Sequence, residues 1–280
     1  MKYLFVGDIH NRYEIMKTIV DFGVENGYKM VFVGDYVDSF KERYSEGEKC
    51  LKLAVELCND HIFILGNHDL HYLDDDFIHA GYNENFRFSF NSYLKQLRKR
   101  FSFAIDDILV THAGLTEKAM NFSMSEKCYK NEKLDAELIS SYIETECVDH
   151  SSSLLTQMGR ARGGKHSVGG ILWCDFYGEF APLPNITQIF GHTMCREFLY
   201  VEYDKTMQQR HKTVEELEGC GWQYNRGMLY PKQLEFVRAK GIEHLKTSTG
   251  NDTYNIDCLT HSIEVLEYDT DTKEFKIHSL

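Results

Sequence analysis

The chain has 280 residues, 42% of them hydrophobic, and a formal net charge of −12 at pH 7. It is long enough to bury a full core, and no apolar run approaches the length of about 18 residues that a membrane-spanning helix needs. The acidic balance argues against bulk nucleic-acid binding, because that mode neutralises phosphates with Lys and Arg. We therefore expect a single domain over residues 1–280 and no membrane partner.

The N-terminal residues 1–8 are too short in their apolar part, and become acidic too soon, for a secretory signal. They read instead as the first core strand, so a cytoplasmic location is expected. The eight cysteines are scattered and form no Cys-x-x-Cys pair. This spacing favours neither a zinc knuckle nor a disulfide framework.

The first 65 residues alternate between apolar runs and helical patterns. Strands are predicted at residues 2–6, 30–33 and 62–65, and apolar residues recur at helical spacing in 11–26 and 47–59. A strand, a helix and a parallel strand form a right-handed unit in nearly all proteins. The pattern therefore predicts half of a layered α/β domain with a parallel sheet.

The rest of the chain is more polar and more varied. A helix is predicted around 86–100, followed by a hairpin of 101–105 and 108–111 and, later, a glycine-rich loop at 160–170. The further elements expected are helices at 120–128, 134–147 and 231–240 and strands at 186–190, 254–258, 262–268 and 274–278. We interpret three segments as insertions that form small helical caps, namely 70–100, 116–165 and 205–250.

Polar side chains follow five of the predicted strands directly. They are carboxylates, imidazoles and one amide, namely Asp8, His10, Asp35, Asp38, Asn67, His68, His112 and His192. Each alone could form a turn or a helix cap. Placing all of them on one sheet edge without compensation would be costly, and ligands bind at that edge of open α/β sheets. This mixture of oxygen and nitrogen ligands, without sulfur, favours first-row divalent metals over magnesium or calcium.

The order of these motifs matches a known pattern. Gly-Asp-x-His, Gly-Asp-x-x-Asp, Gly-Asn-His-Asp, His-Ala-Gly and Gly-His-Thr, spread over residues 7–193, resemble the calcineurin-like metallophosphoesterases. Within them the chain is most similar to the branch of the PPP-type serine/threonine phosphatases and the symmetrical diadenosine tetraphosphatases. The resemblance implies an α/β four-layer sandwich, in which two packed mixed sheets are flanked by helices.

The resemblance also implies a dinuclear metal centre. Its first ion would be held by Asp8, His10 and Asp35, and its second by Asp35 as a bridge together with Asn67, His112 and His192. A water activated between the two ions would attack phosphorus. Manganese is the favoured metal, with iron, zinc, cobalt and nickel as alternatives.

One histidine of the motifs is expected to act as an acid. His68 follows Asn67 directly, and the resemblance implies that it protonates the leaving oxygen with support from Asp38. The alternatives for His68 are a seventh ligand or a turn cap, and Asp69 is expected to cap the turn or support the ligands. Three other histidines lie off the strand ends, and surface or packing roles are expected for His61, His71 and His79.

A bound phosphate also needs cations that do not titrate. The related protein phosphatases carry an Arg directly after Gly-Asp-x-x-Asp, where this chain has Ser39, and Arg43 lies four residues on. The other source is the glycine-rich loop, and at least one of Arg160 and Arg162 is expected to bind phosphate.

The expected activity is metal-dependent hydrolysis of a phosphomonoester in a phosphoprotein or a small phosphorylated molecule. One alternative is hydrolysis of a dinucleoside polyphosphate of the diadenosine tetraphosphate type, favoured by the form of residues 111–115 and by the Arg-x-Arg loop. Another is a nucleic-acid end phosphatase that uses the basic run 95–100, which we otherwise interpret as a solvated helix face. A binding module without turnover is disfavoured, because every ligand and the acid are present.

Overall fold

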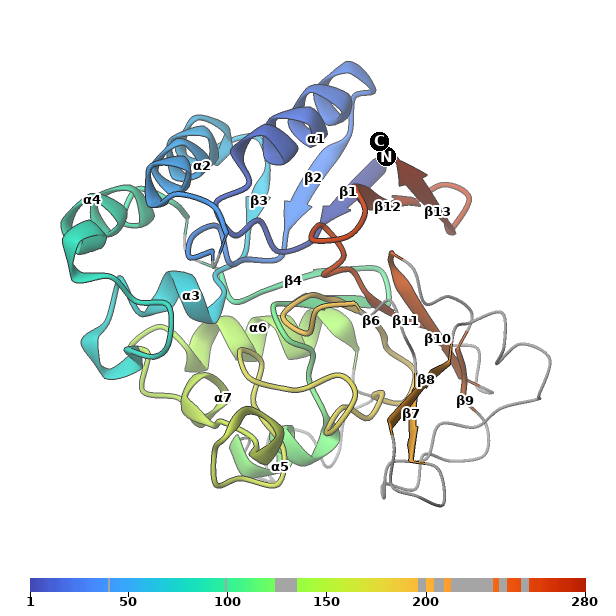
Figure 1. Ribbon diagram of the computed structural model, residues 1–280. Coiled ribbons are helices and arrows are strands. Elements are labelled where there is room, and N and C mark those ends of the chain that lie inside the picture. Colours follow the sequence, from blue (N-terminus) through green and yellow to red (C-terminus); the bar gives the residue numbers. More distant parts are fainter. Residues whose placement is uncertain are drawn as a thin grey trace.

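The computed structural model describes residues 1–39, 41–98, 100–123, 135–195, 200–203, 209–212, 234–236, 241–247 and 252–280. Two mixed β-sheets lie face to face at its centre, and helices cover their outer faces (Figure 1). The α/β sandwich predicted from the sequence is therefore confirmed. None of the helices in these ranges has the length and apolar character needed to span a bilayer.

The first sheet carries the N-terminal strands. Its order is β13-β12-β1-β2-β3, with bounds β1 (Lys2–Val6), β2 (Lys29–Phe32), β3 (Ile62–Phe63), β12 (Glu264–Asp269) and β13 (Glu274–Ser279). The strands β1, β2 and β3 are parallel, whereas β12 is antiparallel to β1. The carboxyl ends of three successive parallel strands therefore meet at one edge.

The second sheet is built from the middle and the end of the chain. Its order is β4-β5-β6-β11-β10-β9, with bounds β4 (Ser102–Ile105), β5 (Ile108–Thr111), β6 (Thr187–Phe190), β9 (Leu234–Phe236), β10 (Glu243–Thr247) and β11 (Asp252–Asn255). A separate pair is formed by β7 (Tyr200–Tyr203) and β8 (Gln209–Lys212).

The helices form the two outer layers (Figure 1). Their bounds are α1 (Tyr13–Glu25), α2 (Tyr44–Leu57), α3 (Asn67–Leu70), α4 (Glu84–Leu94), α5 (Glu117–Ser123), α6 (Ala136–Glu146) and α7 (Ser153–Thr156), with 3-10 turns η1 (Asp75–Phe77) and η2 (Arg160–Arg162). The helices α1 and α2 lie against the first sheet and α6 lies against the second.

Alternation along the strands divides the core into layers. In β1, Leu4 and Val6 pack toward the helices, whereas Phe5 packs against residues of the second sheet such as Tyr254. In β5, Leu109 belongs to the helix side and Val110 to the space between the sheets. Because successive side chains of a strand point to opposite faces, apolar runs are buried on both sides.

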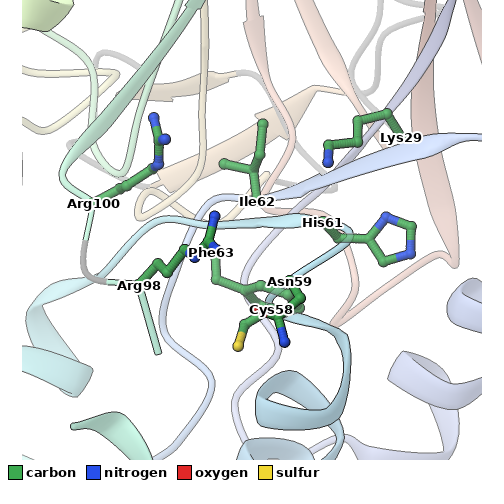
Figure 2. Close-up of a pocket in the computed structure, with 8 residues that line it drawn as sticks. All are labelled: Lys29, Cys58, Asn59, His61, Ile62, Phe63, Arg98 and Arg100. Atoms are coloured by element: carbon green, nitrogen blue, oxygen red, sulfur yellow. The ribbon is translucent and has the colours of Figure 1, made fainter. Parts of the chain in front are cut away.

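Two sequence predictions fail in the second half of the chain. The helix predicted to residue 100 ends at Leu94, and Arg98 and Arg100 lie beside Phe63 at β3 instead of on a helix face (Figure 2). The helix predicted at 231–240 is wrong at 234–236, because these residues pair antiparallel with β10. The remainder of that prediction lies outside the described residues.

The division of the chain stays a prediction. Among the described residues, the segments 70–100 and 116–165 contain no named strand, and β4 and β5 lie between them. Most of the third segment lies outside the described residues.

Candidate metal centre

The first group of metal-binding side chains lies where β1 and β2 end. Nε2 of His10 is 3.9 Å from Oδ2 of Asp8 and 3.7 Å from Oδ2 of Asp35. Nδ1 of His10 donates a hydrogen bond of 2.6 Å to the backbone oxygen of Asp38, which fixes the ring. One ligand atom from each of Asp8, His10 and Asp35 lies within 4.8 Å of the others, so a single cation fits among them.

The second group joins both sheets and again includes Asp35. Nε2 of His112 is 3.4 Å from Oδ2 of Asp35 and 2.9 Å from Oδ1 of Asn67. Nδ1 of His192 lies 2.9 Å from the same Asn67 oxygen. The ligand atoms of Asp35, His112 and His192 are also within 4.8 Å of one another. Oδ2 of Asp35 is thus placed between the two groups, as a bridging carboxylate would be.

Tautomers provide a test of whether metal ions fit. Nδ1 of His10 faces the carbonyl of Asp38, and Nδ1 of His112 faces the carbonyl of Val33 at 2.9 Å. A carbonyl only accepts, so both Nδ1 atoms carry the proton and both Nε2 atoms present lone pairs. Those lone pairs point at the oxygens of Asp8, Asp35 and Asn67, which are acceptors too. Burial lowers the pKa of both imidazoles, so a second proton is disfavoured.

A buried atom without a partner supports the same conclusion. Within the described part of the chain, Oδ1 of Asp8 is buried without a hydrogen-bond partner. Burial, followed by the charges of Asp257 and Asp35, raises the pKa of Asp8, whereas the imidazoles of His112 and its neighbours outweigh burial and lower that of Asp35. A divalent cation in each group would offset the repulsion between the carboxylates, and one in the first group would also satisfy Oδ1 of Asp8, so these residues fit two metal ions.

The backbone around the two groups is strained. Four of the predicted site residues have positive φ without being glycine, namely His10 at 47°, Asp35 at 51°, Asp38 at 61° and His192 at 65°. Such conformations cost of order 1 kcal/mol each and concentrate at functional sites. The tight turns they make explain why all the motifs lie directly after strands.

Two motif glycines are required by close packing. A Cβ on Gly66 would lie 2.1 Å from Oδ1 of Asp35, and a Cβ on Gly191 would lie 1.9 Å from Oδ1 of Asp8. Any side chain at these positions would displace the carboxylates. The Gly-Asn-His-Asp and Gly-His-Thr motifs therefore need glycine for access of the ligands.

Asp38 anchors a hydrogen-bonded cluster beside the two groups. Its Oδ2 lies 3.1 Å from Nδ1 of His68 and 2.6 Å from Nε2 of His71, and its Oδ1 accepts a bond of 2.7 Å from the hydroxyl of Tyr72. Burial alone would raise the pKa of Asp38, but the bonds from His68 and His71 lower it. The charged carboxylate fixes Nδ1–H of His68, and the ring lies 5.3 Å from that of His10.

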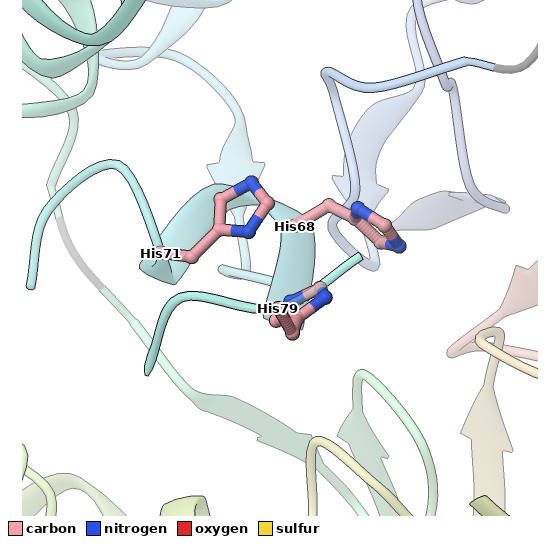
Figure 3. A group of neighbouring side chains, drawn as sticks. All are labelled: His68, His71 and His79. Atoms are coloured by element: carbon pink, nitrogen blue, oxygen red, sulfur yellow. The ribbon is translucent and has the colours of Figure 1, made fainter. Parts of the chain in front are cut away.

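A third histidine, His79, packs against the rings of His68 and His71 (Figure 3). The ring of His79 lies 4.7 Å from that of His68 and 4.4 Å from that of His71, and its Nε2 is 3.1 Å from the backbone oxygen of Asn67. Burial, followed by the neighbouring imidazoles, lowers the pKa of His79 to about 4. Gly81, with φ of +100°, approaches so closely that a Cβ would lie 2.9 Å from Cε1 of His68.

These supporting residues are not predicted from the sequence. Surface or packing roles were expected for His71 and His79, yet His71 is buried and lies against Asp38. Tyr72 and Asp257 were also missed, the latter a carboxylic acid whose pKa is raised to about 7 by burial against the opposing effect of Arg12. None of these residues repeats along the chain in a pattern that would single it out.

Asp69 links the turns that carry the ligands. Its Oδ2 accepts bonds of 2.7 Å from N–H of Asp35 and 2.9 Å from N–H of Gly66, and its Oδ1 accepts one of 2.9 Å from N–H of Tyr36. The side chain is fully buried. It therefore holds the loops after β2 and β3 in register.

The structure distinguishes the two arginines of the glycine-rich loop. Arg162 lies against the His192 turn, where Nε is 3.2 Å from Oδ2 of Asp175 and an NH2 group donates a 2.8 Å bond to Oγ1 of Thr193. Arg160 is exposed. Of these two arginines, Arg162 is therefore the one that is held next to a predicted ligand, His192.

The position that departs from the family pattern has a local role. Oγ of Ser39 accepts hydrogen bonds of 3.1 Å from N–H of Lys41 and 3.0 Å from N–H of Glu42. Arg43 is the N-cap residue of α2 and its side chain is exposed. Ser39 therefore forms a turn before α2.

Comparison with known proteins identifies a related family. A model described as calcineurin-like phosphoesterase matches residues 1–196. No curated protein sequence matched the chain.

Solved structures with low identity span the chain. They include a metallophosphoesterase from Sphaerobacter thermophilus, 12% identical over 100% of this chain and 88% of that chain, with a TM-score of 0.40. A serine/threonine phosphatase from Saccharomyces cerevisiae is 12% identical over 100% and 80%, with a TM-score of 0.44. An archaeal phosphodiesterase is 14% identical over 100% of both chains, with a TM-score of 0.38.

Proposed function

Because the chain belongs to the calcineurin-like phosphoesterase family, we propose that it is a hydrolase that cleaves phosphomonoesters with two divalent metal ions. The observation that carries this proposal is the position of Asp35, whose Oδ2 lies 3.7 Å from Nε2 of His10 and 3.4 Å from Nε2 of His112. One carboxylate thereby serves two separate groups of ligands.

The proposed ligands are those that the geometry brings together. Asp8, His10 and Asp35 would hold one ion, and the other would be held by Asp35, Asn67, His112 and His192. When bound, the ions would polarise the phosphoryl oxygens and make a water molecule a better nucleophile. The mixed nitrogen and oxygen donors suit a first-row divalent ion, and manganese is the one that we propose.

We assign the proton transfer to His68. Its Nδ1 is held by the carboxylate of Asp38, so Nε2 is the nitrogen that exchanges a proton with the substrate. Burial alone would lower the pKa of His68, but Asp35 and Asp38 outweigh it and raise the pKa. An imidazole that keeps its proton near neutral pH suits the protonation of a leaving oxygen.

Arg162 is the proposed phosphate-binding cation. Asp175 and Thr193 fix its guanidinium beside the His192 turn, so little side-chain freedom remains to be lost when an anion binds. A guanidinium also presents several donors in one plane, which matches a phosphate. Arg160, which is exposed, is not assigned this role.

A second candidate is hydrolysis of a dinucleoside polyphosphate. A hollow of about 580 Å³ adjoins residues 11 and 12 directly after His10, and its lining includes the cations Arg12, Lys41 and Arg43. This volume lies in the range of pockets that take nucleotide-sized ligands. Three glutamates also line the hollow, namely Glu14, Glu42 and Glu46, so its formal charge is balanced. The volume of the hollow therefore favours binding of a dinucleoside polyphosphate, whereas its balanced formal charge does not.

The basic run gives little support to a nucleic-acid end phosphatase. Arg98 and Arg100 line a pocket together with Cys58, Asn59 and His61, which precede β3, whereas Asn67 follows β3. A nucleic acid bound at that pocket would therefore lie at the end of β3 opposite to Asn67.

The test compares substrates and one variant. Chelator-treated protein is reloaded with manganese and assayed against p-nitrophenyl phosphate, a phosphopeptide and diadenosine tetraphosphate. We expect hydrolysis of the monoesters that depends on added metal, and we expect Asp35→Asn to lose both bound manganese and activity. Asp21→Asn on the surface of α1 is the control. Turnover of the dinucleotide alone would refute the monoesterase proposal, and an active, metal-loaded Asp35→Asn protein would refute the catalytic centre.

A further inference from the structure

A second cavity lies at the opposite end of the strands that carry the ligands. It has a volume of about 150 Å³ and is lined where β2 begins, at Lys29, and where β3 begins, at Ile62 (Figure 2). Asp35 and Asn67 follow the carboxyl ends of the same two strands. This cavity, the distal pocket, is therefore separated from the metal centre by the length of β2.

The lining of the distal pocket is cationic. Three of its eight residues carry a permanent positive charge, namely Lys29, Arg98 and Arg100, and none of the eight is acidic. The chain as a whole has a net charge of −12. Collecting three cations around one small space costs repulsion energy unless an anion offsets it. The composition of this lining therefore indicates a negatively charged ligand.

Two of the cationic residues, Lys29 and Arg100, are held at the edge of the first sheet by hydrogen bonds. Lys29 is the first residue of β2, and its Nζ donates to the backbone oxygen of Asp60. The backbone oxygen of Arg100 accepts a 2.8 Å bond from N–H of Leu65, and Arg100 also forms a parallel bridge with Ile64. The backbone of Lys29 and Arg100 is thereby held at the rim of the pocket, whereas the side chains of Arg98 and Arg100 are exposed and can turn toward an ion.

A neutral donor completes the lining. Nδ1 of His61 accepts a 3.2 Å bond from N–H of Met30, so the ring proton is on Nε2. Burial, followed by the charge of Lys29, lowers the pKa of His61 and keeps the ring neutral at pH 7. The lining therefore contains an imidazole N–H, two guanidinium groups and one ammonium group, and each of these can donate hydrogen bonds to an oxyanion such as phosphate.

We propose that the distal pocket binds a phosphate group as a second anion site, independent of the metal centre. Its volume of about 150 Å³ is below the range of about 300–1,000 Å³ for pockets that enclose drug-sized molecules. The enclosed part of the ligand is therefore the phosphate itself. Any organic portion remains in solvent, so inorganic phosphate and a phosphate monoester share the same recognition.

The experiment uses chelator-treated full-length protein, so that metal-dependent binding at the other site is removed. Inorganic phosphate is added while the imidazole signals of His61 are followed by NMR, and adenosine monophosphate is added in a separate titration. We expect the His61 signals to shift and saturate with phosphate. Equal saturation with both ligands assigns the pocket to the phosphate group alone, and tighter binding of the nucleotide assigns it to a nucleotide phosphate.

Arg98 and Arg100 are both exposed, so substituting them leaves the buried core unchanged. Arg98→Gln combined with Arg100→Gln should weaken phosphate binding at least tenfold, because charged hydrogen bonds are lost. Arg87→Gln, whose side chain pairs with Asp75 on the surface, is the matched control and should bind like wild type. Thermal unfolding without phosphate checks the fold, and the stabilisation by phosphate should disappear in the double variant.

Two results would overturn the proposal. One is a His61 signal that does not respond to phosphate while the wild-type protein is folded. The other is unchanged affinity in the double variant. Neither measurement involves metal or hydrolysis, so failure here leaves the proposed phosphoesterase activity untouched.

Discussion

Replacing Asp69 by Asn tests whether this buried carboxylate supports the site. The side chain is fully buried, and its two oxygens accept three backbone N–H bonds of 2.7, 2.9 and 2.9 Å from Asp35, Gly66 and Tyr36. Asn has the same size, but one of its terminal atoms donates. The substitution therefore changes hydrogen bonding and leaves the packing volume almost constant.

The expected loss of stability follows from those bonds. If the Asn oxygen accepts from Asp35 and Gly66, the amide nitrogen faces N–H of Tyr36 and leaves a buried donor unsatisfied, which costs about 1–3 kcal/mol. The bonds from N–H of Asp35 and Gly66 keep an oxygen as their acceptor. We expect the free energy of unfolding to fall by about 2 kcal/mol and manganese affinity to fall at least tenfold, because the turns that hold Asp35 loosen.

The assay is urea unfolding in the presence of a chelator, so that lost metal binding does not contribute to the measured stability. Asp21→Asn is the control, since its side chain is 57% exposed and should change stability by no more than about 0.5 kcal/mol. Manganese affinity is measured separately by titration. If Asp69→Asn unfolds within 1 kcal/mol of wild type and binds manganese normally, our account of this residue is wrong; the 1 kcal/mol limit is about one net hydrogen bond.

Three more substitutions test the remaining assignments. His68→Asn should lower kcat by roughly 10²–10⁴-fold for phenyl phosphate and much less for p-nitrophenyl phosphate, whose leaving group needs no acid, with bound manganese unchanged; equal losses would exclude the acid role. Arg162→Gln should lower kcat/KM about 10–100-fold, whereas Arg160→Gln should stay within about twofold; equal effects in steady-state assays would contradict the assignment. Glu267 has its pKa lowered from 4.5 to about 2 by three hydrogen bonds that outweigh burial, so its stabilisation is complete above pH 4.5 and is lost as the pH falls toward 2. Glu267→Gln should therefore be about 2 kcal/mol less stable at pH 7 and equal to wild type near pH 2, as measured by urea unfolding; a constant difference across this range would refute the linkage.

The sequence predicted the ligands because each is locally marked. Asp8, Asp35 and Asn67 directly follow apolar strands, and the parallel topology brings such positions together without any detail of side-chain packing. Their roles as ligands stay a prediction. Several of the missed residues reach the site from the segment after α3, where neither a strand end nor a helical period marks His79 or Gly81. Asp257, which was also missed, follows β11 near the end of the chain.

Other features depended on contacts between distant residues. Arg160 and Arg162 look alike in sequence. Both lie in one 3-10 turn, and what distinguishes them is that Arg162 contacts Asp175 and Thr193. Residues 234–236 carry a helical pattern, but pairing with β10 provides hydrogen bonds that a local pattern cannot anticipate.

The left-handed backbone at four site residues lowers the stability of the fold while it positions the groups of the proposed metal centre. His10, Asp35, Asp38 and His192 together store about 4 kcal/mol at roughly 1 kcal/mol each, a large share of the 5–15 kcal/mol that stabilises a typical domain. Glycine at any of them would relieve backbone strain, and at Asp35 it would also remove a buried charge. A library of variants selected only for resistance to heat or proteases should therefore lose these positions early. Directed evolution of a more robust catalyst from this chain needs selection for turnover in every round.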